Sequence, residues 1–229
     1  MAEALAHAGA NIIIHGVKET EASIKAFEAL KAIGHQVWFC PCDLSQPDAA
    51  QTLYQNCQGQ AGQVDIFISN ASVQCRTKFF DVTSDEIDFQ FVANFKSAYQ
   101  LVQLLAPSMM ERNWGRIITI GSVQEENHHP QFSVYGALKA AQTHLVCNLA
   151  KHQGGKGVTF NNIAPGAINT DRNTDVLSQP DIYQKVLGMI PSGRIGESED
   201  CAGIALLLCS DAGSYINGAN IFVDGGMRL

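Results

Sequence analysis

Short apolar runs alternate with segments of helical spacing along the chain, and the two patterns predict its strands and helices. We expect strands where apolar residues follow one another without polar interruption, at residues 11–15, 36–40, 64–69, 116–120, 158–163 and 219–223. We expect helices where apolar residues recur every three or four positions, at residues 19–33, 45–61, 83–112, 131–152, 181–189 and 198–209, and residues 2–8 are typical of the end of a helix. Strands that are apolar along their whole length indicate a parallel sheet with both faces covered.

The alternation predicts one α/β domain over residues 1–229, built on a doubly wound parallel sheet with right-handed crossovers. Gly9, Gly34 and Gly62 stand where helices should end, and Ser45 with Pro47 should begin the helix at 45–61. Pro107 should bend or end the long helix at 83–112. Residues 165–197 have little sustained periodicity, and they are long enough to form a lid over a site.

Charge and composition narrow the class of protein. The 15 Lys and Arg and the 22 Asp and Glu give a net charge of 15 − 22 = −7, and no basic run could follow a phosphate backbone, which argues against a nucleic-acid partner. No apolar stretch approaches 18 residues and no signal peptide is evident, so we expect a cytosolic protein with no membrane partner. The seven cysteines show no CxxC spacing, and His128 and His129 are adjacent and point apart, so neither a disulfide framework nor a metal site is indicated.

The candidate chemistry lies between Gly121 and Ala141. Tyr135 and Lys139 are four residues apart, so on a helix they share one face. An ammonium about 4 Å from the phenol oxygen would favour the phenolate by roughly 4 kcal/mol, or about three pKa units before desolvation is subtracted. Alone, such a pair is more often an ordinary surface pair. Ser122 ends the strand before it, thirteen residues from Tyr135, and a loop of that length can return the hydroxyl to the start of the helix.

A strand ending in Gly-Ser, followed after thirteen residues by Tyr-x-x-x-Lys, resembles the active-site segment of the short-chain dehydrogenase/reductase family, which uses NAD or NADP to interconvert carbonyls and alcohols. The resemblance extends over residues 1–229 and implies a Rossmann-like fold and a small-molecule substrate. It implies that Tyr135 is the general acid/base, that Ser122 binds the substrate oxygen and that Lys139 also binds the cofactor ribose. It makes Asn94, otherwise a solvated helix position, the fourth catalytic residue, which holds a water beside the lysine.

Three further segments resemble cofactor contacts of the family. Ser69-Asn70-Ala71-Ser72 is similar to its Asn-Asn-Ala-Gly segment, with departures at Ser69 and Ser72, so the resemblance carries over to Asn70 and Ala71. Asp43-Leu44 resembles the segment that meets the adenine ring, and the segment from Pro165 to Thr170 resembles the one that borders the nicotinamide. Taken singly, these could be a turn asparagine, a capping aspartate and a Pro-Gly turn. The last segment contributes four residues: Pro165, Gly166, Ile168 and Thr170.

Several functional details stay open at this level. Gly16-Val17-Lys18 follows the first strand with no acidic residue to repel a 2′-phosphate, which favours NADP over NAD slightly. Excess apolar residues on the long helix, such as Leu101, Val102, Leu104 and Leu105, predict a homodimer, or by analogy with the family a homotetramer. The substrate could be a 3-oxoacyl thioester, a sugar acid, a polyol or a steroid. The rival hypothesis is a non-catalytic dinucleotide-binding or scaffold relative.

The family pattern begins with a strand and a Thr-Gly-x-x-x-Gly-x-Gly loop that receives the pyrophosphate, and this sequence contains neither. We expect that strand between residues 11–15 and 64–69, so its absence should leave a gap of about 10 Å with exposed isoleucines. We therefore expect a native protein that is longer at its N-terminus, and weak cofactor binding and low stability in a chain that starts at Met1.

Overall fold

All strands of the protein are parallel, but they form two separate hydrogen-bonded groups. The computed structural model describes residues 1–229, the side chain of Val176 excepted. In the first group β1 (Ile12–Gly16) pairs with β2 (Val37–Pro41). The second group has the order β3-β4-β5-β6. Its strands are β3 (Ile66–Ser69), β4 (Gly115–Ile120), β5 (Val158–Pro165) and β6 (Asn220–Val223). The predicted strands and their parallel arrangement are confirmed.

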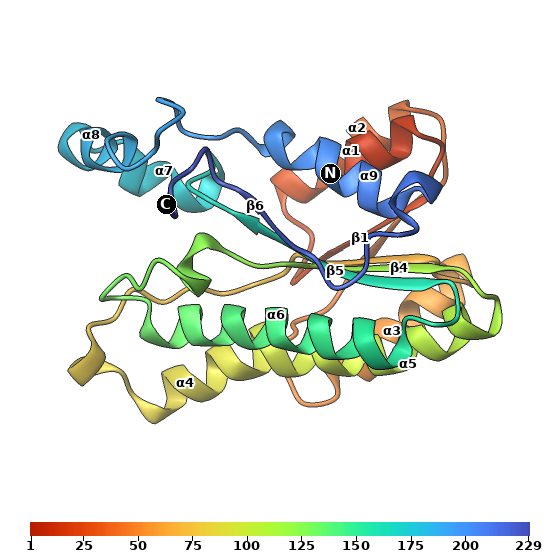
Figure 1. The fold of residues 1–229 in the computed structure, drawn as a ribbon. Coiled ribbons are helices and arrows are strands. Elements are labelled where there is room, and N and C mark those ends of the chain that lie inside the picture. Colours follow the sequence, from red (N-terminus) through yellow and green to blue (C-terminus); the bar gives the residue numbers. More distant parts are fainter.

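Helices cover both faces of the sheet, as a doubly wound fold requires (Figure 1). On one face lie α1 (Ala2–His7), α2 (Glu21–Ala32) and α9 (Ala202–Cys209). On the other lie α3 (Ala49–Ala61), α5 (Ser97–Glu111) and α6 (Ser133–Gln153). Each layer has its own apolar cluster, with Leu208 buried in the first and Met109 in the second. Short 3-10 turns complete the connections: η1 (Phe79–Asp81), η3 (Val123–Glu125), η4 (Ser198–Cys201) and η5 (Asp211–Gly213).

The long helix predicted at 83–112 is a column of three segments. It consists of α4 (Ser84–Gln90), the π-helical segment η2 (Phe91–Lys96) and α5. Pro107 lies inside α5 and does not end it. Leu101, Val102 and Leu105 are buried within the chain, because α5 packs against α3 and β4, so they are not the excess surface that we expected. The exposed apolar side chains of this column lie before α5 and in its first turn, at Ile87, Phe89, Phe91 and Tyr99.

Local differences from the predicted helices have identifiable causes. The helix expected from Ser45 begins at Ala49, because Ser45 is held by Asp43, whose Oδ1 accepts from the Ser45 amide at 3.0 Å and from its hydroxyl at 2.7 Å. Asp48 then turns the chain with a φ of 60°. Residues 165–197 contain two helices, α7 (Asp171–Leu177) and α8 (Pro180–Leu187), of which only the second was expected. The predicted helix ends at Gly9, Gly34 and Gly62 are confirmed by their positive φ angles.

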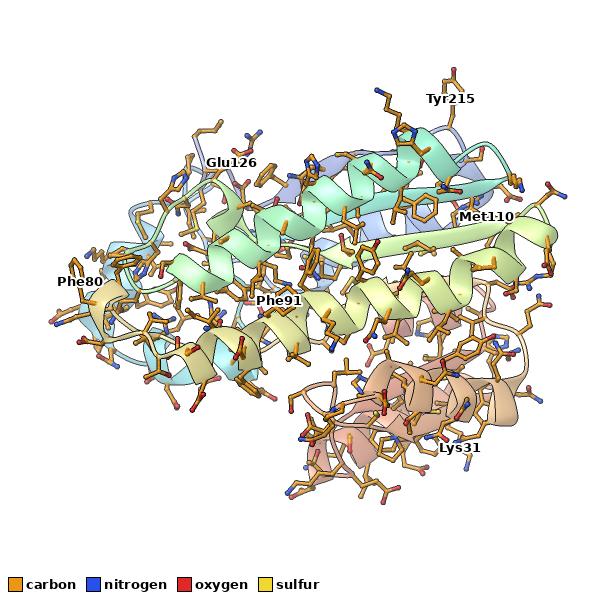
Figure 2. All side chains as sticks on the ribbon, turned by 90° about the horizontal axis from the view of Figure 1, so that it is seen from below. Lys31, Phe80, Phe91, Met110, Glu126 and Tyr215 are labelled. Atoms are coloured by element: carbon orange, nitrogen blue, oxygen red, sulfur yellow. The ribbon has the colours of Figure 1, made fainter. Side chains whose placement is uncertain are left out.

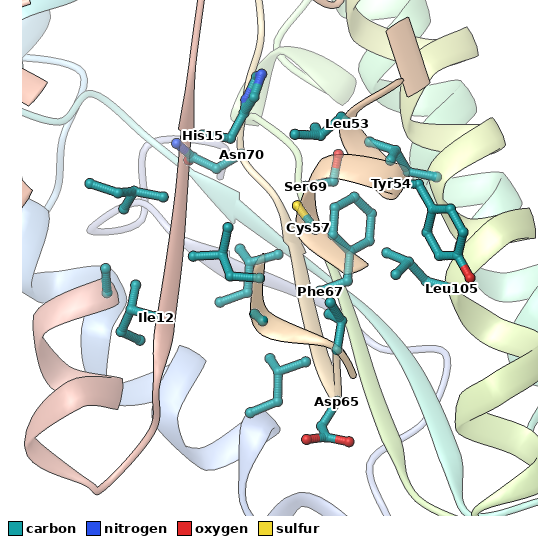
Figure 3. Close-up of a pocket in the computed structure, with 18 of the residues that line it drawn as sticks. Ile12, His15, Leu53, Tyr54, Cys57, Asp65, Phe67, Ser69, Asn70 and Leu105 are labelled. Atoms are coloured by element: carbon teal, nitrogen blue, oxygen red, sulfur yellow. The ribbon is translucent and has the colours of Figure 1, made fainter. Parts of the chain in front are cut away.

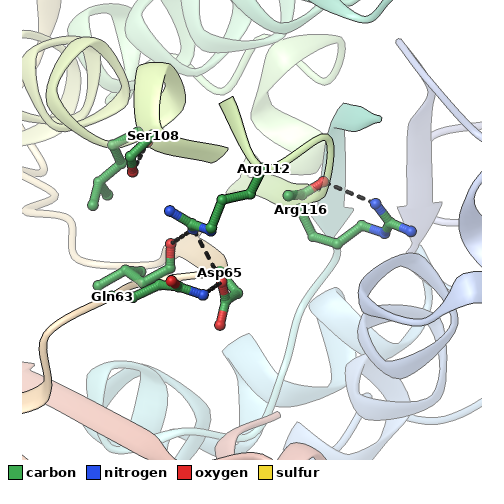
Figure 4. Close-up of polar contacts among 8 residues, drawn as sticks. Gln63, Asp65, Ser108, Arg112 and Arg116 are labelled. Atoms are coloured by element: carbon green, nitrogen blue, oxygen red, sulfur yellow. Dashed lines mark hydrogen bonds and ion pairs between the residues drawn. The ribbon is translucent and has the colours of Figure 1, made fainter. Parts of the chain in front are cut away.

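Polar contacts fix the amino ends of β3 and β4, at the sheet edge opposite the candidate residues (Figure 4). Arg112 Nη2 donates to Asp65 Oδ1 at 3.0 Å and to the Val64 carbonyl at 3.2 Å. The buried Arg116 donates through Nη1 to the Gly115 carbonyl at 2.9 Å. These arginines are therefore structural. Among residues 1–229 we find no helical stretch with the length and apolar character that a bilayer crossing needs.

A cavity of about 930 Å³ separates β1 from β3, which share no hydrogen bonds (Figure 3). Strand residues from both sides line it, among them Ile12, Ile14 and Ile68. The gap expected between these strands is therefore present, although Ile12 is buried and Ile14 and Ile68 are half-buried rather than exposed. At its carboxyl end the cavity reaches Ser69, Asn70 and Ala71.

Candidate active site

The carboxyl ends of β3, β4 and β5 meet at one edge of the sheet, and candidate residues follow each of them. Asn70 comes after β3, Ser122 comes two residues after β4, and Gly166 follows β5. The turn after β4 is tight, because a Cβ on Gly121 would collide with the Glu125 carboxylate. Ser122 then begins η3 with its hydroxyl accepting from the Gln124 amide at 3.2 Å. The strand-end placement that the sequence predicts is thus present for all three segments.

Tyr135 lies in the first turn of α6 with its side chain turned inward. The residue is 5% exposed, and the hydroxyls of Ser122 and Ser72 lie beside its phenol. Burial raises the pKa of the phenol, while the Arg172 charge and these two hydroxyls act in the opposite direction. The ring of Phe132 packs against the Tyr135 ring with centroids 6.0 Å apart. The serine and the tyrosine are therefore brought together as the sequence predicts.

Lys139 lies one turn further along α6, but its ammonium is not at the phenol oxygen. The residue is 2% exposed, and Nζ donates to the Ile120 carbonyl at 2.6 Å. Nζ lies 5.6 Å from the centroid of the Tyr135 ring. Burial, and after it the Arg172 charge, lowers the pKa of Lys139 to about 7. Our expectation that Lys139 lowers the pKa of Tyr135 is therefore wrong for this structure, because the ammonium is directed to the end of β4 and the burial of the phenol dominates.

Asn94 lies within η2 and is not the solvated helix position that we considered. It is 1% exposed, its Oδ1 accepts from the Val73 amide at 2.7 Å, and its Nδ2 donates to the Val73 carbonyl at 2.9 Å. Its own carbonyl accepts from Gln142 Nε2 at 2.9 Å. A π-helical turn inside an α-helical column is common at functional sites. The water-mediated relay from Asn94 to Lys139 stays a prediction.

Glu125 connects this site to its supports, and the sequence analysis did not single it out. Its Oε1 accepts from the Ser122 amide at 3.0 Å and from Asn162 Nδ2 at 3.1 Å. Its Oε2 accepts from the Thr143 hydroxyl at 2.7 Å and from Asn220 Nδ2 at 3.0 Å. One carboxylate thus ties the serine turn to α6, β5 and β6. The Ser-x-x-Glu spacing of a capping box was the available sequence signal.

Arg172 is the second residue that the sequence analysis missed. It lies in the first turn of α7, and Nη1 donates to the Ser72 hydroxyl at 3.0 Å while Nη2 donates to the Ser72 carbonyl at 2.6 Å. Ser72 is one of the departures from the family pattern. These contacts bring residues 165–197 to the loop after β3, next to Tyr135.

The candidate cofactor residues lie at the same sheet edge in three groups. The Asp43 carboxylate is engaged in its own loop, where bonds from Ser45 and Gln46 lower its pKa, and Leu44 is buried beside it. Pro165 ends β5, and a Cβ on Gly166 would collide with Asp224. The remaining residues keep to the same edge: Asn70 and Ala71 line the carboxyl end of the cavity, Ile168 is buried in a bridge to Gly196, and the Thr170 carbonyl accepts from the Asn173 amide at 2.8 Å.

The donor set at this edge fits a dinucleotide in part. The Lys139 ammonium has three donors, and the described residues accept from it at one place, the Ile120 carbonyl, so donors are left for ribose hydroxyls. Asn70 is exposed after β3, where doubly wound folds bind their ligands. The donors at this edge thus suit the ribose of a dinucleotide, while a glycine-rich pyrophosphate loop is not in the sequence.

Comparisons with known proteins agree over nearly the whole chain. The family model described as enoyl-(acyl carrier protein) reductase matches residues 1–228. The chain is 35% identical over 221 residues to the 7alpha-hydroxysteroid dehydrogenase of Escherichia coli (strain K12). The matched region covers 96% of this chain and 86% of that protein. It is 34% identical over 233 residues to a 3-oxoacyl-(acyl-carrier-protein) reductase of Haemophilus influenzae, covering 100% and 92%. A crystal structure of a 3-oxoacyl (acyl-carrier-protein) reductase from Agrobacterium tumefaciens with NADP bound superposes with a TM-score of 0.93 at 34% identity, covering 98% of this chain and 87% of the other.

Proposed function

The chain belongs to the short-chain dehydrogenase/reductase family, and we propose that Ser122, Tyr135, Lys139 and Asn94 carry its proton transfer. As a member it is an NAD(P)-dependent oxidoreductase that acts on a CH-OH or C=O group. The observation that supports these roles best is the buried Tyr135 phenol with the Ser122 hydroxyl beside it, at the edge where the strands end. Two neighbouring hydroxyls there can bind one carbonyl oxygen together.

The chain's own residues account for the proton at that oxygen. The bound nicotinamide cofactor supplies or removes the hydride. In reduction, the Tyr135 hydroxyl donates its proton to the substrate oxygen while the Ser122 hydroxyl donates a hydrogen bond to the same atom. The phenolate that forms is stabilised by the nearby charge of Arg172. The pKa of Lys139 at about 7 allows it to exchange a proton with solvent near neutral pH.

The test is a scan of the purified protein against carbonyl compounds with NADH and NADPH, with nucleotide oxidation followed by absorbance. The native enzyme should reduce at least one of them. Ser122→Ala and Tyr135→Phe should both lose turnover while remaining folded, as shown by a cooperative thermal unfolding transition. Full turnover in both variants would overturn the residue roles, and dinucleotide binding without turnover of any carbonyl in the native protein would favour the non-catalytic relative.

We propose NADP as the preferred cofactor, with Lys18 near its 2′-phosphate. Lys18 follows β1, is exposed, and forms no ion pair within residues 1–229. A cation at the end of this strand is the feature that favours a 2′-phosphate in doubly wound folds. Lys18→Glu should therefore reverse the ratio of the Kd values for NADPH and NADH in a fluorescence titration. A native protein that binds NADH more tightly would contradict this preference.

We also propose that the protein is a homodimer or homotetramer joined through the α4-η2-α5 column. Phe91, Phe95 and Tyr99 form an aromatic row along this column, with ring centroids 5.8 and 6.1 Å apart, and Figure 2 shows where Phe91 lies. Phe91 is 41% and Tyr99 is 40% exposed, which is unusual for large apolar side chains in neighbouring turns. A second copy related by twofold symmetry would cover this row. Light scattering at micromolar concentration tests the proposal, and a monomeric mass would refute it.

The proposal also covers the domain organisation and the location of the protein in the cell. The chain is one dinucleotide-binding domain in which residues 165–197 form a lid, a role supported by the contact from Arg172 to Ser72. A cytosolic location is supported by the seven cysteines, which are all free thiols in the structure and suit a reducing compartment.

A further inference from the structure

Arg172 places a positive charge beside the reacting hydroxyls. Its Nη1 donates to the Ser72 hydroxyl at 3.0 Å, and that hydroxyl lies beside the Tyr135 phenol. The Ser72 hydroxyl therefore lies between the guanidinium and the phenol oxygen. A small molecule whose carbonyl oxygen meets Tyr135 therefore lies within reach of Arg172.

The present contacts of Arg172 leave its charge without a counterion. The side chain is exposed, and both oxygens that it meets belong to Ser72 and are neutral. None of the five ion pairs within the described residues includes it. A guanidinium has a planar pair of donors that matches a carboxylate or a phosphate, and its bonds to an anion are about twice as strong as bonds to neutral oxygens. An incoming anion would compete well with Ser72.

Other cations surround the same place although the chain as a whole carries a charge of −7. The Arg76 guanidinium lies 4.8 Å from the ring of Phe132, which itself packs against Tyr135. The charges of Arg76 and Lys185 both reach His129, whose ring is 4.7 Å from that of Phe132. Arg76, Lys185 and Arg172 come from three separate segments, and none of them is in an ion pair within the described residues.

The nearby acids do not neutralise these charges. Glu125 accepts from four neutral donors and faces the serine turn. Glu126 is paired with Arg228 at 3.3 Å. Asp171 precedes Arg172 in α7, and no hydrogen bond or ion pair within the described residues joins the two side chains. Three cations that form no ion pair within the described residues thus lie around the mouth of the site, where they can attract and orient an anionic ligand.

We propose that the substrate is a carboxylic acid, and that Arg172 binds its carboxylate while Tyr135 and Ser122 hold its carbonyl or hydroxyl oxygen. Because Arg172 contacts Ser72 beside the Tyr135 phenol, the site favours a carboxylate one to three carbons from the reacting carbon, as in short oxo acids and their hydroxy acids. The reaction converts the oxo acid, one NAD(P)H and one proton into the hydroxy acid and NAD(P)⁺. This inference rests on the proposed function and adds the substrate class to it.

The experiment compares each acid with its own methyl ester, which keeps the carbonyl and removes the charge. Suitable pairs are 2-oxobutanoate, 3-oxobutanoate and 4-oxopentanoate with their esters. The readout is the ratio of kcat/KM for acid over ester in the native enzyme and in Arg172→Met, Arg172→Lys and Lys156→Met. Any effect of Arg172 on the pKa of Tyr135 acts on both members of a pair and cancels in the ratio. Lys156 is exposed in the turn before β5, so its variant removes the same charge far from the mouth.

The native enzyme should prefer at least one acid over its ester. Loss of a charge-assisted bidentate contact corresponds to a fall of about 10- to 100-fold, so Arg172→Met should lower the ratio by that factor. Arg172→Lys should retain part of the preference, and Lys156→Met should keep it. Without any cofactor, 3-hydroxybutanoate should raise the melting temperature of the native protein and not that of Arg172→Met.

Two results would overturn the inference. If the native enzyme reduces esters or neutral ketones and shows acid-to-ester ratios near one, the proposed function stands and the carboxylate site does not exist. If Arg172→Met leaves the ratio unchanged and raises the KM for NAD(P)H, Arg172 serves the phosphates of the cofactor instead. A native enzyme that reduces no carbonyl compound, while its thermal shift with the hydroxy acid persists, would instead refute the proposed function alone.

Discussion

Replacement of Glu125 by glutamine should destabilise the protein and disturb its active site, because one carboxylate satisfies four donors. Glutamine has nearly the same shape, but one of its two oxygens becomes an amino group. If the amide oxygen keeps the Ser122 amide and Asn162 Nδ2, the amino group faces the Thr143 hydroxyl and Asn220 Nδ2. The threonine hydroxyl can rotate to accept.

Asn220 has no such freedom, because its Oδ1 already accepts from Asn162 Nδ2 at 2.8 Å. Two amino groups then face each other in a half-buried site. An unsatisfied buried donor costs about 1–3 kcal/mol, and hydrogen bonds to a charged acceptor contribute about 1.5–3 kcal/mol against roughly 1 for neutral ones. Allowing for the partial exposure of Glu125, the total should be about 2–4 kcal/mol, or about 4–16 °C in Tm for a chain of this size.

The adjacent residue supplies a matched control. Glu126 is exposed and paired with Arg228 at 3.3 Å, so Glu126→Gln removes the same charge from a surface ion pair. Exposed pairs contribute about 0–1 kcal/mol, and this variant should unfold within that range of the native protein. Urea unfolding at fixed protein concentration gives both free energies, and NAD(P)H oxidation shows whether Glu125→Gln also lowers kcat through the Ser122 turn.

Equal free energies of unfolding for the two variants would refute the reasoning. Such a result would mean that water or a rearranged Asn220 satisfies the new amino group at no cost. A stability loss in Glu125→Gln with unchanged kcat would separate the two effects, and the network would then support the fold without positioning Ser122.

Three further predictions concern Tyr135, Lys139 and the exposed ring of Phe91 on the α4-η2-α5 column. Tyr135→Phe should lower turnover by about 10² to 10⁴ with an unchanged Tm, and near-normal turnover would exclude the tyrosine as proton donor. Because burial lowers the folded-state pKa of Lys139 to about 7, the unfolded chain binds the extra proton above that pH, so the unfolding free energy should rise between pH 7 and 9.5 relative to Lys139→Met. A constant difference over that range, measured by urea unfolding, would show that the lysine keeps its charge. Phe91→Glu should lower the mass seen by light scattering at micromolar concentration, because the exposed ring would bring a charge into the interface, and an unchanged oligomer would place the interface elsewhere.

The strands were predictable because each is a short apolar run. A run such as residues 116–120 is typical of a strand that is buried on both faces of a parallel sheet. The residues after the strands followed from the same logic, since the carboxyl ends of parallel strands meet at one edge. Ser122 and Asn70 could therefore be assigned to one edge of the sheet from the sequence. The position of the gap between β1 and β3 followed from the resemblance to the family.

The π-helical turn at Phe91–Lys96 lay beyond the sequence, because its period differs from 3.6 only over six residues and its composition is ordinary for a helix. The start of α3 was mispredicted for a related reason. Ser45 and Pro47 are good residues for a helix start, but Asp43 competes for the Ser45 amide and hydroxyl, and such local side-chain bonds are not visible in a periodic pattern.

The charges around the active site are what the sequence predicts least well. A spacing of four residues places Lys139 and Tyr135 on one face of α6, but it does not say where the ammonium points. The Ile120 carbonyl, 19 residues away, takes that bond, and Arg172, 37 residues beyond Tyr135, brings the second cation. A side chain's pKa depends on every charge and every buried surface around it. Local sequence therefore predicts which groups titrate, while the tertiary fold decides in which direction their pKa values shift. Here the fold opposes the ionisation of both the tyrosine and the lysine.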